Sequence, residues 1–128
     1  LIQIIILSCA KNKNSDYYYE KSFHENGILH TEIKKNQGAL HGETKVWNDK
    51  GKLIKIVTYS NNILHGKMIE YYYNGNVMHE VYYENGFKNG SEIWYYENSQ
   101  PKTEDIYNKG NKISETIRWD LNGDIIYK

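Results

Sequence analysis

A spacing of 24 residues recurs through most of this chain and constrains its fold more than any other feature. Residues at this spacing form three glycine-rich columns and two aromatic columns. The glycine-rich columns are Gly42, Gly66, Gly90 and Ser114; Gly27, Gly51, Gly75, Ser99 and Gly123; and Gly38, Asn62, Gly86 and Gly110. The aromatic columns are Phe23, Trp47, Tyr71, Tyr95 and Trp119, and Tyr59, Tyr83 and Tyr107. Five columns in one register indicate a repeat protein.

Each repeat is predicted to form a β-hairpin, because apolar and polar residues alternate at a period of two. The turn between the two strands is expected near Asn74-Gly75, where positive φ angles suit a tight turn. The strand before this turn is expected to place Ile69, Tyr71 and Tyr73 on one face. The strand after it is expected to place Val77, Val81 and Tyr83 on one face. Equivalent turns are predicted near Asn26-Gly27, Lys50-Gly51, Asn98-Ser99 and Asn122-Gly123.

Successive hairpins predict an all-β fold, an elongated antiparallel meander of about ten short strands in a single-layer sheet. The repeat domain spans residues 17–128, and no shift in composition divides it. A helix is disfavoured because Tyr, Trp, Ile and Val dominate the periodic positions and the runs between glycines are short.

The first residues differ from the repeats. An apolar run, Leu1-Ile2-Gln3-Ile4-Ile5-Ile6-Leu7, ends in Ser8-Cys9-Ala10, and polar residues follow. This pattern resembles the lipobox of a bacterial lipoprotein signal peptide, although the chain lacks an initiating methionine and a basic segment before the run. The resemblance implies a truncated signal segment at 1–9, a polar linker at 10–16 and lipid attachment at Cys9. The alternative is an N-terminal β-strand with an ordinary cysteine.

The repeat pattern Gly-x-x-x-x-Tyr-Tyr-x-Asn-Gly resembles the MORN repeat. More narrowly, it looks like the bacterial variant found in YwqK-family antitoxins. The resemblance covers about 17–128, with Gly66, Tyr71, Asn74, Gly75, Tyr83 and Gly86 in register. It implies an interaction and assembly module, and the antitoxin resemblance implies neutralisation of a partner protein.

Composition and spacing argue against several classes of function. The formal net charge is zero, with 16 basic and 16 acidic residues spread along the repeats and no basic stripe. Binding to nucleic acid therefore has little electrostatic support, and binding to an anionic membrane is disfavoured. His41 and His65 share a column with Asn89 and Ile113, which favours a turn position over a metal ligand. His24, His30 and His79 are expected at the surface. We expect no metal site, no cofactor, no catalytic residues and no enzymatic activity.

The aromatic column of Trp47, Tyr71, Tyr95 and Trp119 is expected to stack as the core ladder of the sheet. By strand parity, Tyr72, Trp94 and Tyr96 lie on the opposite face and are candidate partner-binding residues. The two roles are compatible, because one face can pack while the other binds.

The predicted function is a non-enzymatic protein-interaction module, serving as a lipid-anchored scaffold of the bacterial cell envelope. An antitoxin or immunity protein is the alternative, and a lipid-binding module ranks third. The partner is expected to be a protein of unknown identity, with the membrane reached only through the lipid anchor. Ile126 lies in an apolar C-terminal edge segment that is expected to pair with a second copy or to accept a partner strand. The alternative for this segment is a frayed terminus.

Overall fold

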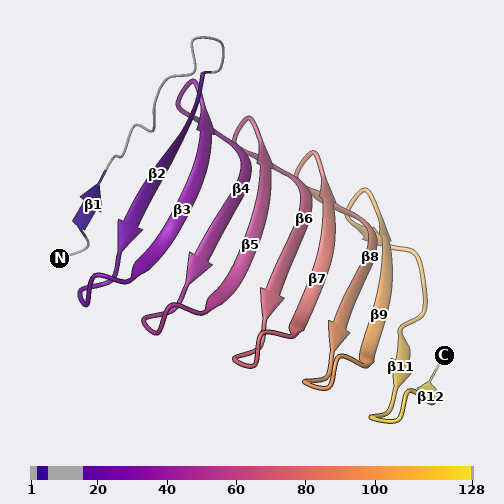
Figure 1. The fold of residues 1–128 in the computed structure, drawn as a ribbon. Coiled ribbons are helices and arrows are strands. Elements are labelled where there is room, and N and C mark those ends of the chain that lie inside the picture. The colour runs from indigo at the N-terminus through magenta and orange to yellow at the C-terminus, as the bar shows by residue number, and fades with distance from the viewer. Residues whose placement is uncertain (1–2, 6–15, 128) are drawn as a thin grey trace.

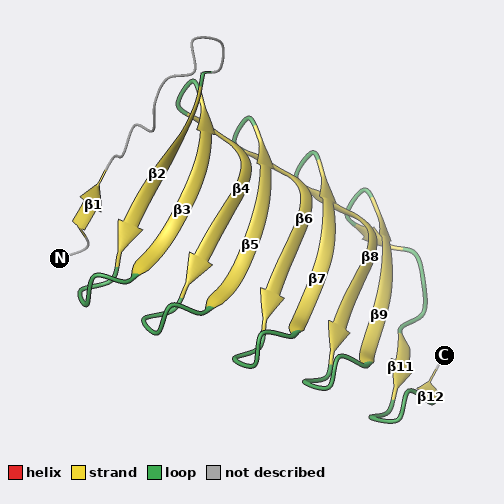
Figure 2. Ribbon diagram, viewed as in Figure 1, coloured by secondary structure: helices red, strands yellow, loops and turns green. Residues whose placement is uncertain are grey.

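The computed structural model describes residues 3–5 and 16–127, and these residues form one antiparallel sheet of twelve strands (Figure 1). Figure 2 shows strands joined by loops, with no helix among the described residues. The strands are β1 (Gln3–Ile5), β2 (Tyr17–Phe23), β3 (Leu29–Asn36), β4 (Ala39–Trp47), β5 (Leu53–Ser60), β6 (Ile63–Tyr71), β7 (Val77–Glu84), β8 (Phe87–Tyr95), β9 (Pro101–Asn108), β10 (Asn111–Lys112), β11 (Ile117–Trp119) and β12 (Ile125–Tyr127).

The strands lie side by side almost entirely in chain order, from β1 to β9 and then β11 and β12, with β10 paired to β9. The sheet is elongated and open, and each repeat contributes one hairpin (Figure 1). The predicted all-β, single-layer meander is therefore confirmed. Gln3–Ile5 forms β1 against β2, which is the strand that the alternative interpretation of the apolar run expects. Cys9 lies outside the described residues.

Turns occur at all five predicted positions, but they are longer than the tight turn expected at Asn74-Gly75. The Gly75 amide donates to the Tyr72 carbonyl at 3.0 Å, and the Tyr72 amide donates to the Asn76 carbonyl at 2.9 Å. Only Gly75 within this loop has a positive φ, of 92°. The tight two-residue turns lie at the opposite end of the hairpins. There, Asn85 and Gly86 have φ values of 50° and 86°, as a type I′ turn requires.

A glycine with positive φ interrupts the pairing in each long first strand. Gly42, Gly66 and Gly90 have φ values of 95°, 113° and 98° within β4, β6 and β8. The register shifts beside each of them, so these strands carry β-bulges, and bulges bend and twist a strand. In the last copy, the column holds Ser114. Here the strand is divided into β10 and β11, and the Ile106 amide donates to the Ser114 hydroxyl at 2.9 Å instead.

A second register shift separates residues that the sequence pattern places on one face. Glu70 pairs with His79 but Tyr71 pairs with Val77, so β7 contains one extra residue at this point. Paired residues share a face and successive residues alternate. Val77 therefore lies on the face of Tyr71, whereas Val81 and Tyr83 lie on the face of His79. The expected common face of Val77, Val81 and Tyr83 is wrong, because simple parity fails across a bulge. We call the two surfaces the Tyr71 face and the His79 face.

The most buried side chains lie on the His79 face. Val57 and Val81 are 7% and 2% exposed, and Met68 pairs with both of them across β6. The expected core ladder of Trp47, Tyr71, Tyr95 and Trp119 is only half-buried on the opposite face. The core of the described sheet is therefore centred on the His79 face of β5 to β8.

Replacing Gly66 with alanine is predicted to destabilise the sheet more than the same change at Gly90. Both positions require a positive φ, which costs alanine about 1–2 kcal/mol. A Cβ at Gly66 would also lie 3.0 Å from the Cβ of Thr58, whereas nothing lies within 4 Å at Gly90. Urea unfolding of the two variants measures the difference. Equal losses would show that the contact with Thr58 is unimportant.

Candidate interaction face around His79 and Trp94

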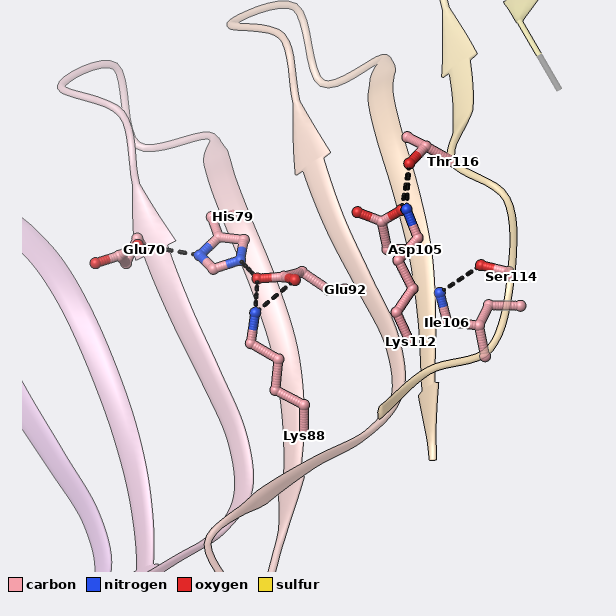
Figure 3. A network of polar contacts seen from close by, with 9 residues as sticks. All are labelled: Glu70, His79, Lys88, Glu92, Asp105, Ile106, Lys112, Ser114 and Thr116. Carbon is pink, nitrogen blue, oxygen red and sulfur yellow. Dashed lines mark hydrogen bonds and ion pairs between the residues drawn. The ribbon is translucent and has the colours of Figure 1, made fainter. Parts of the chain in front are cut away.

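A cluster of charged side chains crosses four strands on the His79 face. Successive pairings put Lys55, Glu70, His79 and Trp94 side by side on β5, β6, β7 and β8. Glu92 lies on the same face of β8, two residues before Trp94. The hairpin register thus assembles, in the middle of the sheet, side chains that are far apart in the sequence, and Figure 3 shows Glu70, His79 and Glu92 among them.

His79 is the centre of this cluster and is only 5% exposed. Its Nδ1 lies 3.1 Å from Oε2 of Glu70, and its Nε2 lies 2.9 Å from Oε1 of Glu92. A carboxylate can only accept hydrogen bonds, so a ring nitrogen that bonds to one does so as a donor. The geometry places the His79 ring between two carboxylates, each within hydrogen-bonding distance of one ring nitrogen. The expectation that His79 lies at the surface is wrong.

Each carboxylate is also paired with a lysine. Lys55 lies 3.0 Å from Oε1 of Glu70, and Lys88 contacts both oxygens of Glu92 at 2.7 and 2.6 Å. Burial raises the pKa of Glu92, but the hydrogen bonds from Lys88 and His79 outweigh it and hold the pKa below its ordinary value of 4.5. The pKa of Glu70 is lowered in the same way, with burial opposed by Lys55 and His79. Two lysines and the His79 ring thus share these two carboxylates.

The indole of Trp94 packs against one face of the His79 ring. The two rings are stacked, with centroids 4.0 Å apart and planes inclined by 13°. Stacked aromatic rings gain attraction in addition to the area that they bury. Trp94 itself is 41% exposed, so part of a large, firmly held aromatic side chain faces solvent.

A second network holds the irregular segment between β10 and β11. Asp105 lies on β9 opposite Glu92, where the earlier repeats have Val57 and Val81. Its Oδ1 lies 2.6 Å from Nζ of Lys112 and accepts a hydrogen bond from the Thr116 hydroxyl at 2.7 Å (Figure 3). Burial raises the pKa of Asp105, but these two bonds lower it overall. The polar replacement thus fastens the segment that lacks the bulge glycine.

The other candidate partner-binding residues lie away from this cluster. Tyr72 and Tyr96 stand in the loops after β6 and β8, and their hydroxyls donate to the carbonyls of Tyr95 at 2.7 Å and Trp119 at 3.0 Å. They join neighbouring repeats, as does His24 through the Trp47 carbonyl at 2.9 Å. These residues occupy one column of the repeat, a signal that could have indicated the shared role. Ile126, on β12, is 64% exposed.

The Tyr71 face carries its own polar contacts. The Tyr95 hydroxyl donates to Glu80 at 2.8 Å, and burial together with this bond raises the pKa of Tyr95 to about 12. Glu80 also pairs with Lys67 at 3.0 Å. Within the described residues, no three His, Cys, Asp or Glu side chains are arranged to hold a metal ion. Nor do residues 3–5 and 16–127 contain a helix with the length and apolar character needed to cross a bilayer.

Comparison with known proteins agrees with this architecture. The family model described as MORN repeat variant matches residues 40–61, 64–86 and 88–109, which together exceed half of the chain. The chain belongs to the MORN repeat variant family. Each matched segment contains one of the longer loops, which lie around Gly51, Gly75 and Ser99, and the strands on either side of it. No curated protein matches the sequence.

Two solved structures share the fold of this MORN repeat chain. One is a point mutant of S. aureus TarM in complex with Fondaparinux, alpha-GlcNAc-glycerol and UDP, with a TM-score of 0.53 and 15% identity. It matches 91% of this chain but 21% of its own. A second TarM structure has a TM-score of 0.52 and 15% identity, over 88% of this chain and 20% of its own. The chain spans about a fifth of the length of these structures, and the likeness shows the fold alone.

Acid is predicted to destabilise the sheet through the two carboxylates beside His79. Their folded-state pKa values lie below 4.5, so their stabilisation is complete above that pH and is lost as the pH falls through the folded-state values. Glu92→Gln should cost about 3 kcal/mol at pH 7, because it removes the charge that pairs with Lys88 and accepts a hydrogen bond from the buried His79 ring. The variant's free energy of unfolding should also fall less steeply than that of the wild type as the pH is lowered. Urea unfolding between pH 3 and 7 measures the loss of stability and its pH dependence, with the exposed Glu97→Gln as the control. If the free energy of unfolding changed with pH in parallel for wild type and Glu92→Gln, the stabilising role of the Glu92 carboxylate would be contradicted.

Proposed function

We propose that this MORN repeat chain is a non-enzymatic protein-interaction module that serves as a lipid-anchored scaffold of the bacterial envelope. MORN repeats are generally protein- or membrane-interaction modules. The observation that supports the proposal most is Trp94, which is 41% exposed and yet stacked on a buried, hydrogen-bonded histidine. Exposed tryptophan is a frequent anchor of protein interfaces. A side chain that is already ordered loses little entropy on binding.

The contacts of the ionisable residues argue for binding rather than catalysis. A general base needs a free lone pair close to its substrate. In His79 both ring nitrogens are occupied by Glu70 and Glu92, and these carboxylates are in turn occupied by Lys55 and Lys88. Such a closed set of ion pairs favours a structural support for the surface above it.

The binding face can be identified by photo-crosslinking in cells. Tyr107 and Ile106 are neighbours on β9 and point to the His79 face and the Tyr71 face, respectively. A benzophenone amino acid at position 107 should crosslink to an envelope protein, whereas the same group at position 106 should not. Ile106 is 37% exposed, so its substitution is a matched control. Equal crosslinking from both positions, or none from either, would overturn the proposed interface.

The lipid anchor rests on the lipobox-like sequence that ends at Cys9. Processing there would remove β1 and leave β2 as the first strand of the mature sheet. The full gene and its Cys9→Ala variant should therefore differ on membrane fractionation, with only the wild type in the membrane fraction. Equal partition of the two proteins would refute the anchor and leave the binding face to be judged separately.

The antitoxin alternative is supported by the resemblance of residues 17–128 to the YwqK-family pattern. It predicts a small neighbouring gene whose expression is lethal without this protein. Co-expression of that gene with wild type and with Trp94→Ala would connect the neutralisation to the His79 face. Survival of cells that express the neighbouring gene alone would exclude this role.

A further inference from the structure

One row of the His79 face continues beyond Trp94 towards the C-terminal strands. His79 pairs with Trp94, Trp94 with Thr103, and Thr103 with Arg118, on β7, β8, β9 and β11. Paired residues share a face, so all four side chains leave the sheet on the same side. Adjacent strands lie about 4.8 Å apart, which sets the spacing between neighbours in this row.

The first two members of the row show that the spacing between adjacent strands accommodates one stacked pair of rings. His79 and Trp94 stand ring against ring, with centroids 4.0 Å apart and nearly parallel planes. One aromatic ring on each strand is thus enough to give stacking contact along this row. His79 covers one face of the indole, and Trp94 remains 41% exposed.

The next position has no ring. Thr103 has a short side chain, and beyond it Arg118 is exposed, with its charge contributing to the lowered pKa of Asp105. Trp94 and Arg118 are two strand steps apart, or about 10 Å. A ring between them would lie about 5 Å from each, within the usual range for stacked aromatic groups. The register thus places Trp94 and Arg118 as the two walls, and Thr103 as the floor, of the position that we call the ring slot.

We propose that the ring slot binds an aromatic side chain of a protein partner, stacked between the indole of Trp94 and the guanidinium of Arg118. A planar guanidinium stacks on aromatic faces and is attracted by their quadrupole. Asp105 lies two residues from Thr103 on the same strand and face, and it interacts electrostatically with Arg118, so an anionic occupant would compete with Asp105 for the guanidinium. This inference rests on the proposed function in one respect, namely that the ring belongs to a protein.

The test uses N-acetyl-tyrosinamide, with N-acetyl-leucinamide and adenosine 5′-monophosphate as the competing classes. Nuclear magnetic resonance spectra of the labelled protein report the indole N–H of Trp94 and the methyl group of Thr103. The tyrosine probe should shift both signals saturably and should bind at least ten-fold more tightly than the other two. Trp47 and Trp119 lie on the Tyr71 face and are internal controls, because their indole signals should not move.

Two variants separate the slot from general surface binding. Thr103→Phe places a ring in the slot and should abolish the shift of the Trp94 signal, whereas Ile106→Phe on the opposite face should not. Arg118→Gln removes the cation from an exposed position and should weaken tyrosinamide binding about five-fold. It provides the answer if Thr103→Phe fails to fold. Unchanged binding in both slot variants, or tighter binding of the leucine or nucleotide probe, would overturn the inference. If tyrosinamide bound but the crosslinking experiment captured no protein, the ring slot would stand as a binding site and the proposed function would be contradicted.

Discussion

Every strand in the described sheet depends on its neighbours, because the described residues provide no second layer over either face. Backbone ladders join the strands, and both ends of the hairpins carry further bonds between repeats. At the long loops, the side-chain amides of Asn26, Asn74 and Asn98 donate to carbonyls 23 residues later. At the tight turns, the Gly86 and Gly110 amides donate to the carbonyls of Leu64 and Lys88 at 2.8 Å. The 24-residue period is thus the period of a hydrogen-bonding pattern, and each repeat orders the next.

The second consequence of a single layer is a core in which charge replaces part of the apolar packing. Only Val57 and Val81 are buried apolar residues among those described, and beside them stand the buried His79 and Glu92. Such polar groups are costly to bury unless each has a partner. Here, each polar group has a partner on the same or a neighbouring strand, in a network that spans four strands and consists of Lys55, Glu70, His79, Glu92 and Lys88. The cluster fixes the orientation of Trp94 and connects the stability of the sheet with the surface that we propose for binding.

The repeat period was sufficient to predict the hairpins, the meander and the positions of the loops. The period was insufficient to predict which side chains share a face of the sheet, because the bulge between Val77 and His79 shifts the alternation by one residue. The interior position of His79 could not be predicted either. Its partners Glu70 and Glu92 are 9 and 13 residues away on different strands, and only the register brings them together. Ser114 did mark a deviation in the glycine column, and the structure shows the strand divided at that point.

The central claim is that one cooperative sheet depends on neighbour contacts and is most stable around the buried residues of β6 to β8. Native-state hydrogen exchange of backbone amides tests this claim most directly, since protection reports the free energy of local opening. The slowest amides should lie in β6, β7 and β8, near Met68, Val81 and Glu92, and protection should decline stepwise towards β2 and β11. Protection that is greatest in the terminal strands, or uniformly low throughout the sheet, would contradict the account.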